Sequence, residues 1–519
     1  MTSRRWFWAI VLVSAVLRLL TYCSRPSLSY DETMLALNVA TRSFAGLLAP
    51  LDYHQTAPAL YLWFVKLAVL IGGVGDLALR LPSLLAGLAV PVVGWRVARR
   101  LMPDPAARFV AGVLALAPGL AQYSSIVKPY EVDALVTLVI LDLTLVWQDE
   151  AEHAARWWAL AAAGGVAVCL SSTAVLVLAG AGLAMLLHGH RVRASGVIAA
   201  WVASFAVAYF AFYRATATGG YMQTYWAADF LTPATYALDG RAWGVLSHSF
   251  VEALVLRPVP TAVALGATAL FLIGLGRIKR ARGWSGVALL AGPIGATILA
   301  SLVRRYPFNW RLLLFAVPLA VLLLGGTLAW GLDERRAAVR RAVVVAAAVV
   351  LFALLSVDVS HPYRTAPVRQ LVDTAAARPR GEPIYIFSGA IPAWGLYATD
   401  WRAPDRPGLD SLAAWVDGAP TDAVLGGSAV IGRPSGTSWR VGVGVTKPHP
   451  DSGWADHEVD RLARAAGPEG RAWLLFTQVY GSEIQDVRGT LARAGAREIS
   501  ADGARGAMLL HVSFPRSGS

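Results

Sequence analysis

The stretch from Leu312 to Val357 determines the class of protein. It reads LLLFAVPLAVLLLGGTLAWGL at 312–332, DERRAAVRR at 333–341 and AVVVAAAVVLFALLSV at 342–357. Two apolar segments of roughly bilayer-spanning length flank a short loop rich in arginine. Arginine and lysine gather in the cytoplasmic loops of membrane proteins, so this stretch predicts two spanning helices joined inside the cell.

The same alternation of apolar segments and basic loops extends over the first 357 residues. Hydrophobic residues make up 56% of the chain and charged residues 15%, with a mean hydropathy of +0.52, which excludes an ordinary soluble protein. The net charge of +13 comes mostly from the loops between apolar segments, which argues against nucleic-acid binding. About eleven spanning helices are expected, at 6–23, 78–98, 107–126, 132–148, 157–171, 173–187, 195–213, 259–276, 284–302, 312–332 and 342–357.

The basic loops also predict the topology. They lie at 4–5, 96–108, 156, 191–193, 277–282 and 335–341. Placing all of them in the cytoplasm puts the N-terminus inside, with an uncleaved first helix, and the C-terminus outside. Residues 58–73 are apolar enough to span, but a span there would reverse the side of 96–108. We therefore expect an interfacial or re-entrant helix within one external loop, 24–77, which begins with an amphipathic surface helix from Glu32 to Leu48.

The composition changes after the last apolar segment. Proline, glycine and charged residues become common, and apolar runs shorten to strand length at 383–387, 473–476 and 508–512, with a helical pattern at 483–494. This predicts a membrane domain over 1–357 and a soluble extracytoplasmic α/β domain over 358–519.

An acidic pair, Asp31 and Glu32, stands just outside the first helix. Acidic residues at a helix start satisfy free backbone amides, so a helix cap is one interpretation of the pair. The other is a general base that takes a proton from an acceptor hydroxyl or amine. His54 precedes the apolar segment at 58–73 and is either a membrane-surface residue or part of the same site. A divalent metal near these three side chains is a further hypothesis, although their spacing matches no ligand pattern.

Two further outer turns carry charges that are costly beside lipid. Lys128, Tyr130 and Glu131 crowd the turn between the third and fourth expected helices, and the run RRYPFNWR occupies 304–311. Arginines at an outer helix end break the positive-inside rule, and guanidinium groups match phosphate oxygens by bidentate hydrogen bonding. These turns predict a lipid-phosphate site, and anchoring to lipid headgroups is the alternative.

Five motifs, in this order, resemble family 39 glycosyltransferases. That family has the GT-C fold and includes protein O-mannosyltransferases and the lipid A aminoarabinose transferase. The motifs are the Asp31-Glu32 pair, a His/Gln-x-x-Pro-x-Leu-Tyr element ending at Tyr61, Ala78-Leu-Arg80-Leu-Pro-Ser83, Tyr123-Ser-x-x-x-Lys128-Pro-Tyr130 and Tyr306-Pro-x-x-x-Arg311.

The resemblance implies an inverting transfer of a monosaccharide from a polyprenyl-phosphate donor on the extracytoplasmic face. The resemblance assigns Asp31 as catalytic base with Glu32 beside it, Lys128 and Arg311 at the donor phosphate, and His54 and Arg80 around the substrate cavity. From the charged outer turns we add Arg304 and Tyr306 to the expected phosphate site and Tyr130 and Glu131 to the expected cavity. The acceptor, a glycan, lipid or protein of the cell envelope, stays open, because HQTAP at 54–58 replaces the His-Pro-Pro of protein O-mannosyltransferases.

Two other classes of protein share some of these features. A transporter or flippase of lipid-linked substrates would also have many helices and few intramembrane charges. Transporters usually show internal repeats around a midplane site, however, whereas the charges here gather at the outer face. A non-catalytic assembly protein would leave Asp31, Lys128 and Arg311 unexplained.

Overall fold

The computed structural model describes residues 2–24, 27–214, 221–232, 241–256, 259–333, 336–360, 366–379, 382–398, 424–425, 428–431, 454–466, 470–479, 482–504 and 506–515. The chain divides into two compact units. The first comprises 1–24, 48–50 and 56–363, and the second comprises 25–47, 51–55 and 364–519. The expected boundary between a membrane domain over 1–357 and a second domain over 358–519 stays a prediction.

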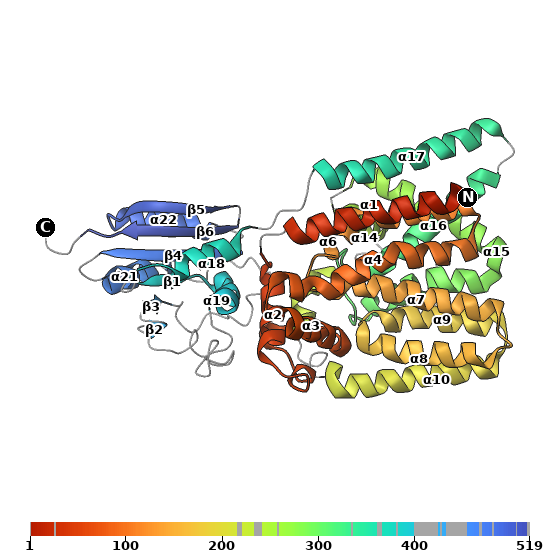
Figure 1. Cartoon of the computed structure of the whole chain (residues 1–519), viewed down its shortest axis with the longest axis horizontal. Coiled ribbons are helices and arrows are strands. Elements are labelled where there is room, and N and C mark those ends of the chain that lie inside the picture. The colour runs from red at the N-terminus through yellow and green to blue at the C-terminus, as the bar shows by residue number, and fades with distance from the viewer. Residues whose placement is uncertain are drawn as a thin grey trace. The chain divides into compact units, whose positions relative to one another are not determined.

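The first unit is a bundle of helices that run side by side (Figure 1). Its longer helices are α1 (Thr2–Ser24), α3 (Ala59–Gly72), α4 (Asp76–Leu101), α5 (Asp104–Leu116), α7 (Tyr130–Asp149), α8 (Ala154–Leu170), α9 (Ala174–His188), α10 (Arg191–Ala208), α14 (Arg241–Val255), α15 (Thr261–Leu302), α16 (Val317–Asp333) and α17 (Ala337–Ser360). Shorter elements are α6 (Pro118–Tyr123), the π-helix η3 (Tyr209–Tyr213), α12 (Tyr221–Tyr225), η4 (Ala227–Asp229) and η5 (Leu314–Ala316).

Each expected apolar segment lies largely on helix in this unit. The segments at 259–276 and 284–302 share α15, which bends at Gly283, where φ is 64°. Among the described residues, six helices are long and apolar enough to cross a membrane by length and composition. The number of spans in the whole chain stays a prediction. At 14 residues α3 is about 21 Å long, shorter than a bilayer core of roughly 30 Å. Because α9 has only 15 residues, length does not separate the two helices, and the interfacial position of α3 stays a prediction.

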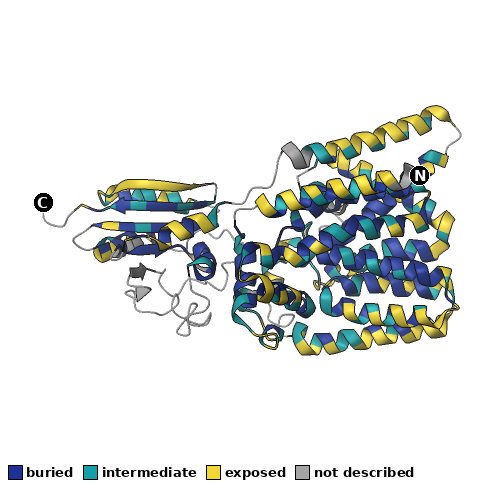
Figure 2. Ribbon diagram, viewed as in Figure 1, coloured by how far each residue is buried: buried dark blue, intermediate teal, exposed yellow. Residues whose placement is uncertain are grey.

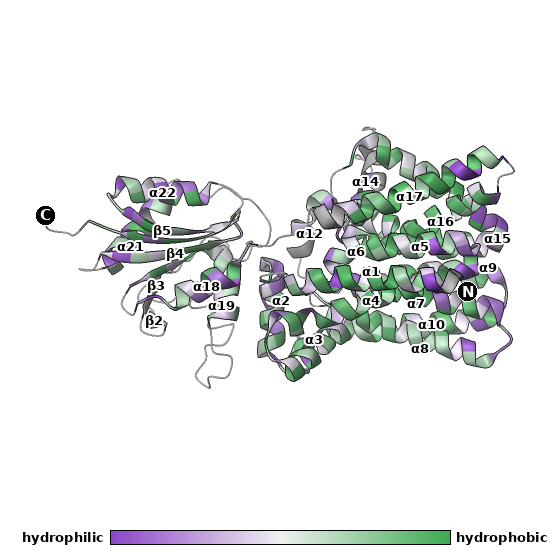
Figure 3. Ribbon diagram, turned by 45° about the horizontal axis from the view of Figure 1, so that its top comes forward, coloured by the Kyte–Doolittle hydropathy of each residue, from purple (hydrophilic) through white to green (hydrophobic). Residues whose placement is uncertain are grey.

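Burial separates central helices from peripheral ones. In the most apolar 18-residue window of each helix, 83% of the residues are buried in the η5–α16 span and 6% in α17. Figure 2 shows the same contrast, since α17 is mostly yellow while the middle of the bundle is dark blue. The exposed side chains on α17 include Val345, Val349 and Phe352, and apolar residues cover the helices along their length (Figure 3). Such a surface is stable only when it faces lipid.

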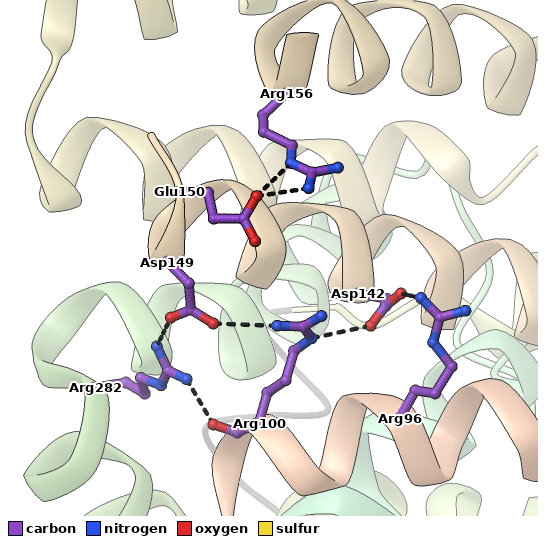
Figure 4. A network of polar contacts seen from close by, with 7 residues as sticks. All are labelled: Arg96, Arg100, Asp142, Asp149, Glu150, Arg156 and Arg282. Atoms are coloured by element: carbon purple, nitrogen blue, oxygen red, sulfur yellow. Dashed lines mark hydrogen bonds and ion pairs between the residues drawn. The ribbon is translucent and has the colours of Figure 1, made fainter. Parts of the chain in front are cut away.

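One end of the bundle is held by a network of arginines and carboxylates (Figure 4). Arg100 on α4 contacts Asp142 at 3.4 Å and Asp149 at 3.2 Å, both on α7. Arg282 of α15 contacts Asp149 at 2.6 Å and donates to the Arg100 carbonyl. The network also includes the pairs Arg96–Asp142 and Arg156–Glu150. The basic loops at 96–108, 156 and 277–282 therefore share one end, as predicted.

Exposed tryptophans mark this end as a membrane interface. Trp8 on α1 adjoins Phe7, which stacks on Trp95 of α4 beside Arg96. Trp158 and Trp284 follow the network residues Arg156 and Arg282, and both are exposed. Tryptophan favours the boundary between lipid and water. The protein is thus a multi-pass membrane protein, and which side this end faces stays a prediction.

The second unit contains a six-stranded mixed sheet with strand order β2-β3-β1-β4-β6-β5. Its strands are β1 (Ile384–Ile386), β2 (Val424–Leu425), β3 (Ser428–Ile431), β4 (Arg471–Thr477), β5 (Arg497–Ala504) and β6 (Ala507–Ser513). Its helices are α2 (Tyr30–Thr41), η2 (Asp52–His54), α18 (Val368–Ala376), η6 (Ser388–Ala390), α19 (Ile391–Tyr397), α21 (Trp454–Ala466) and α22 (Glu483–Arg493), while η1 (Gly46–Leu48) straddles the two units. β1 is parallel to β3 and β4, and β6 is antiparallel to β4 and β5.

The sheet has an apolar core on each face. Residues of alternating orientation in β1 and β4 divide between two clusters, with Ile384 and Leu475 in one and Tyr385 and Leu474 in the other. The predicted α/β character of the C-terminal region is therefore confirmed, and a separate extracytoplasmic domain over 358–519 stays a prediction. The three expected strands and the expected helix at 483–494 match β1, β4, β6 and α22.

Candidate active site

The acidic pair lies in the first turn of α2, and Ser29 is the N-cap residue of this helix. The Ser29 amide donates a hydrogen bond to the Glu32 carboxylate at 2.9 Å, as in a capping box. The helix-cap interpretation thus describes Glu32, which is fully buried. Asp31 is one residue earlier and partly exposed. Its role as catalytic base stays a prediction.

The expected amphipathic surface helix from Glu32 to Leu48 was wrong. α2 ends at Thr41, and eight consecutive residues from Glu32 to Val39 are buried. A helix at a surface would leave one face exposed. The segment is buried on nearly every side because it is a core element of its unit.

The segment with His54 is held along α2. Asn38 forms two hydrogen bonds with the backbone of Asp52, from its amide nitrogen at 3.3 Å and to its oxygen at 2.9 Å. Arg42 pairs with the Asp52 carboxylate at 2.8 Å, and Gln55 contacts the sulfur of Met34. The chain from 52 to 55 therefore runs back toward the start of α2. The His54 side chain lies outside the described residues, so its predicted role stays untested.

The turn that carries Lys128 begins at a broken helix in the other unit. α5 ends at Leu116, and α6 begins at Pro118, whose ring nitrogen cannot donate a hydrogen bond. Arg18 of α1 occupies the break, donating to the carbonyls of Ala115 at 2.7 Å and Leu114 at 3.1 Å. A cation at a helix C-terminus is favourable, and carbonyls at membrane depth need such partners.

Arg18 also faces Glu131 on the first turn of α7. Their side chains are 3.9 Å apart, and both are fully buried. Gly87 of α4 lies against this pair, since a β-carbon there would be 3.1 Å from the Arg18 Nε and 3.3 Å from the Glu131 Oε1. Glu131 was predicted to line the substrate cavity, and that stays a prediction, but the geometry gives it a partner within the bundle.

Helix α4, which carries Arg80, forms a hydrogen bond with the backbone of Lys128. Ser83 of α4 donates to the Lys128 carbonyl at 3.2 Å, and the hydroxyl of Tyr61 on α3 is 3.5 Å from Ser83. Arg80, one turn earlier on α4, is fully buried. Two of the expected motifs, at 78–83 and 123–130, are thus in direct contact.

The turn that carries Arg311 is braced by a segment absent from the predicted site. Asp229 accepts a hydrogen bond from the Asn309 side chain at 2.8 Å, and its carbonyl accepts one from the Phe308 amide at 2.8 Å. The Asn309 oxygen accepts from the Arg311 amide at 3.1 Å. The Arg311 guanidinium lies 5.5 Å from the ring centre of Trp226, a cation–π contact.

The Lys128 and Arg311 turns meet through aromatic rings. Tyr123 contacts Tyr130 at 5.3 Å and Trp310 at 6.3 Å between ring centres. Tyr306 donates to the Leu312 carbonyl at 2.8 Å. Burial, reinforced by the nearby Asp133 carboxylate, raises the pKa of the Tyr306 hydroxyl well above its usual value, so this hydroxyl is a neutral donor.

The remaining predicted residues are placed less tightly. Arg304 is exposed, with a left-handed backbone at φ 56° at the end of α15. Lys128 and Arg311 lie in the first unit and Asp31 in the second, so the expected opposition of base and cations stays a prediction. Among the described residues, no three His, Cys, Asp or Glu side chains are grouped as a metal site requires. A metal near Asp31 stays a hypothesis because the His54 side chain is outside that set.

Reasoning from the sequence missed Trp226, Asp229 and Asn309. Asn309 stood inside a motif that was already quoted, between tyrosine and arginine positions. Asp229 lies in the short external stretch TYWAADF at 224–230, where an isolated acidic residue among aromatics was the available signal.

Comparison with solved structures identifies the fold. The chain resembles ArnT from Cupriavidus metallidurans in the apo state, with a TM-score of 0.56 and 14% identity over 98% of both chains. It is similar to the same protein bound to undecaprenyl phosphate, with a TM-score of 0.53, 15% identity and 98% of both chains covered. The archaeal oligosaccharyltransferase AglB from Archaeoglobus fulgidus, in complex with an inhibitory peptide and a dolichol-phosphate, matches with a TM-score of 0.51 and 12% identity over 80% of this chain and 67% of that one.

The fold is therefore that of the GT-C membrane glycosyltransferases, as predicted. Residues 56–213 match the family model described as dolichyl-phosphate-mannose-protein mannosyltransferase. That range includes α3, α4, the Lys128 turn and all of α10 and η3. Comparison with curated protein sequences found no match.

Proposed function

We propose that this protein transfers a monosaccharide from a polyprenyl-phosphate donor to an acceptor in the cell envelope. The family match over residues 56–213 and the shared fold support a membrane glycosyltransferase with a polyprenyl-phosphate-linked donor. The observation that carries the proposal is the junction of the Lys128 and Arg311 turns through Tyr123. Two turns that each carry a cation are well suited to hold one phosphate.

The reaction is a single displacement. The acceptor oxygen or nitrogen attacks the anomeric carbon of the sugar as the bond from that carbon to the phosphate oxygen breaks. The polyprenyl phosphate leaves with the electron pair, and the acceptor proton passes to the Asp31 carboxylate. One displacement inverts the anomeric configuration. The base is needed because a hydroxyl is a weak nucleophile until its proton is removed.

The cations act on the leaving group. Lys128 and Arg311 stabilise the negative charge that grows on the phosphate as the glycosidic bond breaks. The Trp226 ring and the Asn309 oxygen restrict the Arg311 residue before the donor binds, so less order must be created on binding. The neutral Tyr306 hydroxyl can donate a further hydrogen bond after releasing the Leu312 carbonyl.

Donor sugar and acceptor are narrower proposals. A hexose or a pentose fits the proposed chemistry, since both present the same anomeric centre. The reaction is proposed to occur outside the cytoplasm, where the basic clusters would place both turns. The lipid bilayer holds the donor's polyprenyl chain, and no nucleic acid takes part.

Purified protein in lipid vesicles tests the proposal. With a radiolabelled polyprenyl-phosphate sugar, the protein should transfer the sugar to a membrane acceptor extract or to water. Lys128→Ala and Arg311→Ala should each weaken donor binding by about 1.5 to 3 kcal/mol, the energy of a charge-assisted contact. A transporter would move the intact donor across the vesicle membrane without breaking its glycosidic bond.

The base assignment has its own test. Asp31→Asn keeps size and hydrogen bonding but removes basicity, so turnover should collapse while donor affinity stays near wild type. Glu32→Gln should be milder, because glutamine also completes a capping box. Retention of most turnover by Asp31→Asn would contradict the assigned role.

A further inference from the structure

The second unit holds the chain immediately ahead of α2. The Ser27 hydroxyl donates to the Ala366 carbonyl at 2.7 Å and accepts from the Val368 amide at 3.0 Å. The Leu28 amide donates to the Tyr397 hydroxyl at 2.9 Å. These hydrogen bonds join residues between 339 and 369 positions apart in the sequence. Ser27 and Leu28 are almost completely buried, so water does not compete with the contacts.

The hydrogen bonds of Ser27 and Leu28 to Ala366, Val368 and Tyr397 are called the grip. Its partner residues are themselves held in place. Ala366, Val368 and Tyr397 pack against an apolar core that includes Leu371 of α18 and Leu475 of β4. α19, which ends at Tyr397, packs on α2, and the Arg369 guanidinium lies over the Tyr397 ring at 5.4 Å. The grip therefore connects α2 to the centre of the C-terminal sheet.

The connection reaches the acidic pair within a few residues. Ser27 and Leu28 are held, Ser29 caps α2 through Glu32, and Asp31 follows in the first helical turn. A helical turn has fixed geometry, so holding its first residues fixes the direction of the Asp31 side chain. A general base must be placed closely, because a 1 Å error can cost about a hundredfold in rate.

We propose that the C-terminal domain positions the catalytic base, with Ser27 and Tyr397 as the positioning residues that set the start of α2. This rests on the proposed function, in which Asp31 accepts the acceptor's proton. The domain then serves the reaction through α2, whether or not it also contacts the acceptor.

Single substitutions in the full-length protein test the grip. Tyr397→Phe removes one hydroxyl and keeps the ring in the core, and Ser27→Ala removes two hydrogen bonds. Each should lower kcat roughly fivefold to tenfold, the effect of about one lost hydrogen bond on the transition state, with donor affinity unchanged. Tyr385→Phe is the matched control, because its buried ring packs on the opposite face of the sheet and its loss of a hydroxyl should leave kcat unchanged.

The same substitutions in an Asp31→Asn background separate positioning from general stability. If Tyr397 acts through Asp31, Tyr397→Phe should cause no further loss of single-turnover rate once the base is gone. Hydrogen exchange of the α2 amides should be faster in Tyr397→Phe and in Ser27→Ala than in wild type. Unchanged exchange of the other amides would verify that the rest of each variant is folded.

Three results would overturn the inference, and they are distinguishable. Equal losses in both backgrounds would show that Tyr397 supports the fold without positioning the base. Wild-type kcat in Tyr397→Phe and Ser27→Ala, with Asp31→Asn inactive, would remove the grip and leave the proposed function intact. Full activity in Asp31→Asn would remove the base, and the positioning role with it.

Discussion

The brace behind Arg311 is the hydrogen bond between the Asp229 and Asn309 side chains. Exchanging these two residues tests whether the brace contributes to donor binding. Asn309→Asp alone places two carboxylates where a hydrogen bond of 2.8 Å now joins amide and carboxylate. Asp229→Asn with Asn309→Asp reverses the donor and acceptor and restores that bond. The carboxylate that the second substitution introduces still offers an oxygen to the Arg311 amide, as the Asn309 side chain does at 3.1 Å.

The expected magnitude follows from the geometry. Two charges about 3 Å apart repel by about 1.4 kcal/mol in water and about 5.5 kcal/mol at an effective dielectric constant of 20. Asp229 is partly exposed and the carboxylates can turn apart, so the lower half of that range applies. From this repulsion alone, Asn309→Asp should destabilise the turn by about 1.5 to 3 kcal/mol. If this free energy is lost from the contact between Arg311 and the donor phosphate, the donor Kd rises roughly tenfold to a hundredfold.

Equilibrium binding of undecaprenyl phosphate to the purified protein is the assay. Asp229→Asn alone should weaken binding only a few fold, because a neutral amide pair can still form one hydrogen bond. The double variant should return to within about threefold of wild type, since the exchange restores most of the coupling energy. A double variant no better than Asn309→Asp alone would refute the brace, and Arg311→Ala serves as the reference for full loss of the cation.

Three further outcomes are expected. Arg18→Met or Glu131→Gln alone should destabilise the bundle by about 3 to 5 kcal/mol in thermal unfolding, and the double variant should recover part of that loss because no buried charge is left alone. Burial lowers the pKa of His511 below its usual 6.5, so near that pH the unfolded chain binds more protons than the folded chain. The stability of the C-terminal domain should therefore fall as pH drops below about 7. Calorimetry of His511→Gln should show a weaker dependence of stability on pH. Reporter fusions after Arg100 should lie in the cytoplasm and fusions after Lys66 outside, and the reverse for Arg100 would invert the proposed topology.

The sequence predicts the elements of this protein better than their contacts. The apolar segments and the strands β1, β4 and β6 follow from hydrophobic period and length, which act locally. The amphipathic helix expected after Glu32 was wrong because its second face is buried by residues distant in sequence, among them α19. Local periodicity carries no information about such a partner.

The candidate site divides in the same way. Lys128 and Arg311 could be singled out because charges beside lipid need a reason. Ser27 and Tyr397 could not, since a serine beside a membrane helix and a tyrosine 369 positions from its Leu28 partner are each ordinary when taken alone. Asn309 was visible within its motif, but its value depends on Asp229, which only the folded chain brings near.

The guanidinium of Arg18 in the break between α5 and α6 has a consequence for biogenesis. α1 is synthesised before α5, and the carbonyl of Ala115 lies 97 positions downstream of Arg18. Until α5 enters the bilayer, Arg18 has neither those carbonyls nor Glu131. The cost is at most about 2.5 to 3.5 kcal/mol, the value for a charge at the helix centre, because Arg18 lies nearer the end of α1 at Ser24. α1 should therefore insert weakly by itself and be retained at the insertion machinery until α5 and α7 arrive, which makes its release a late step in assembly.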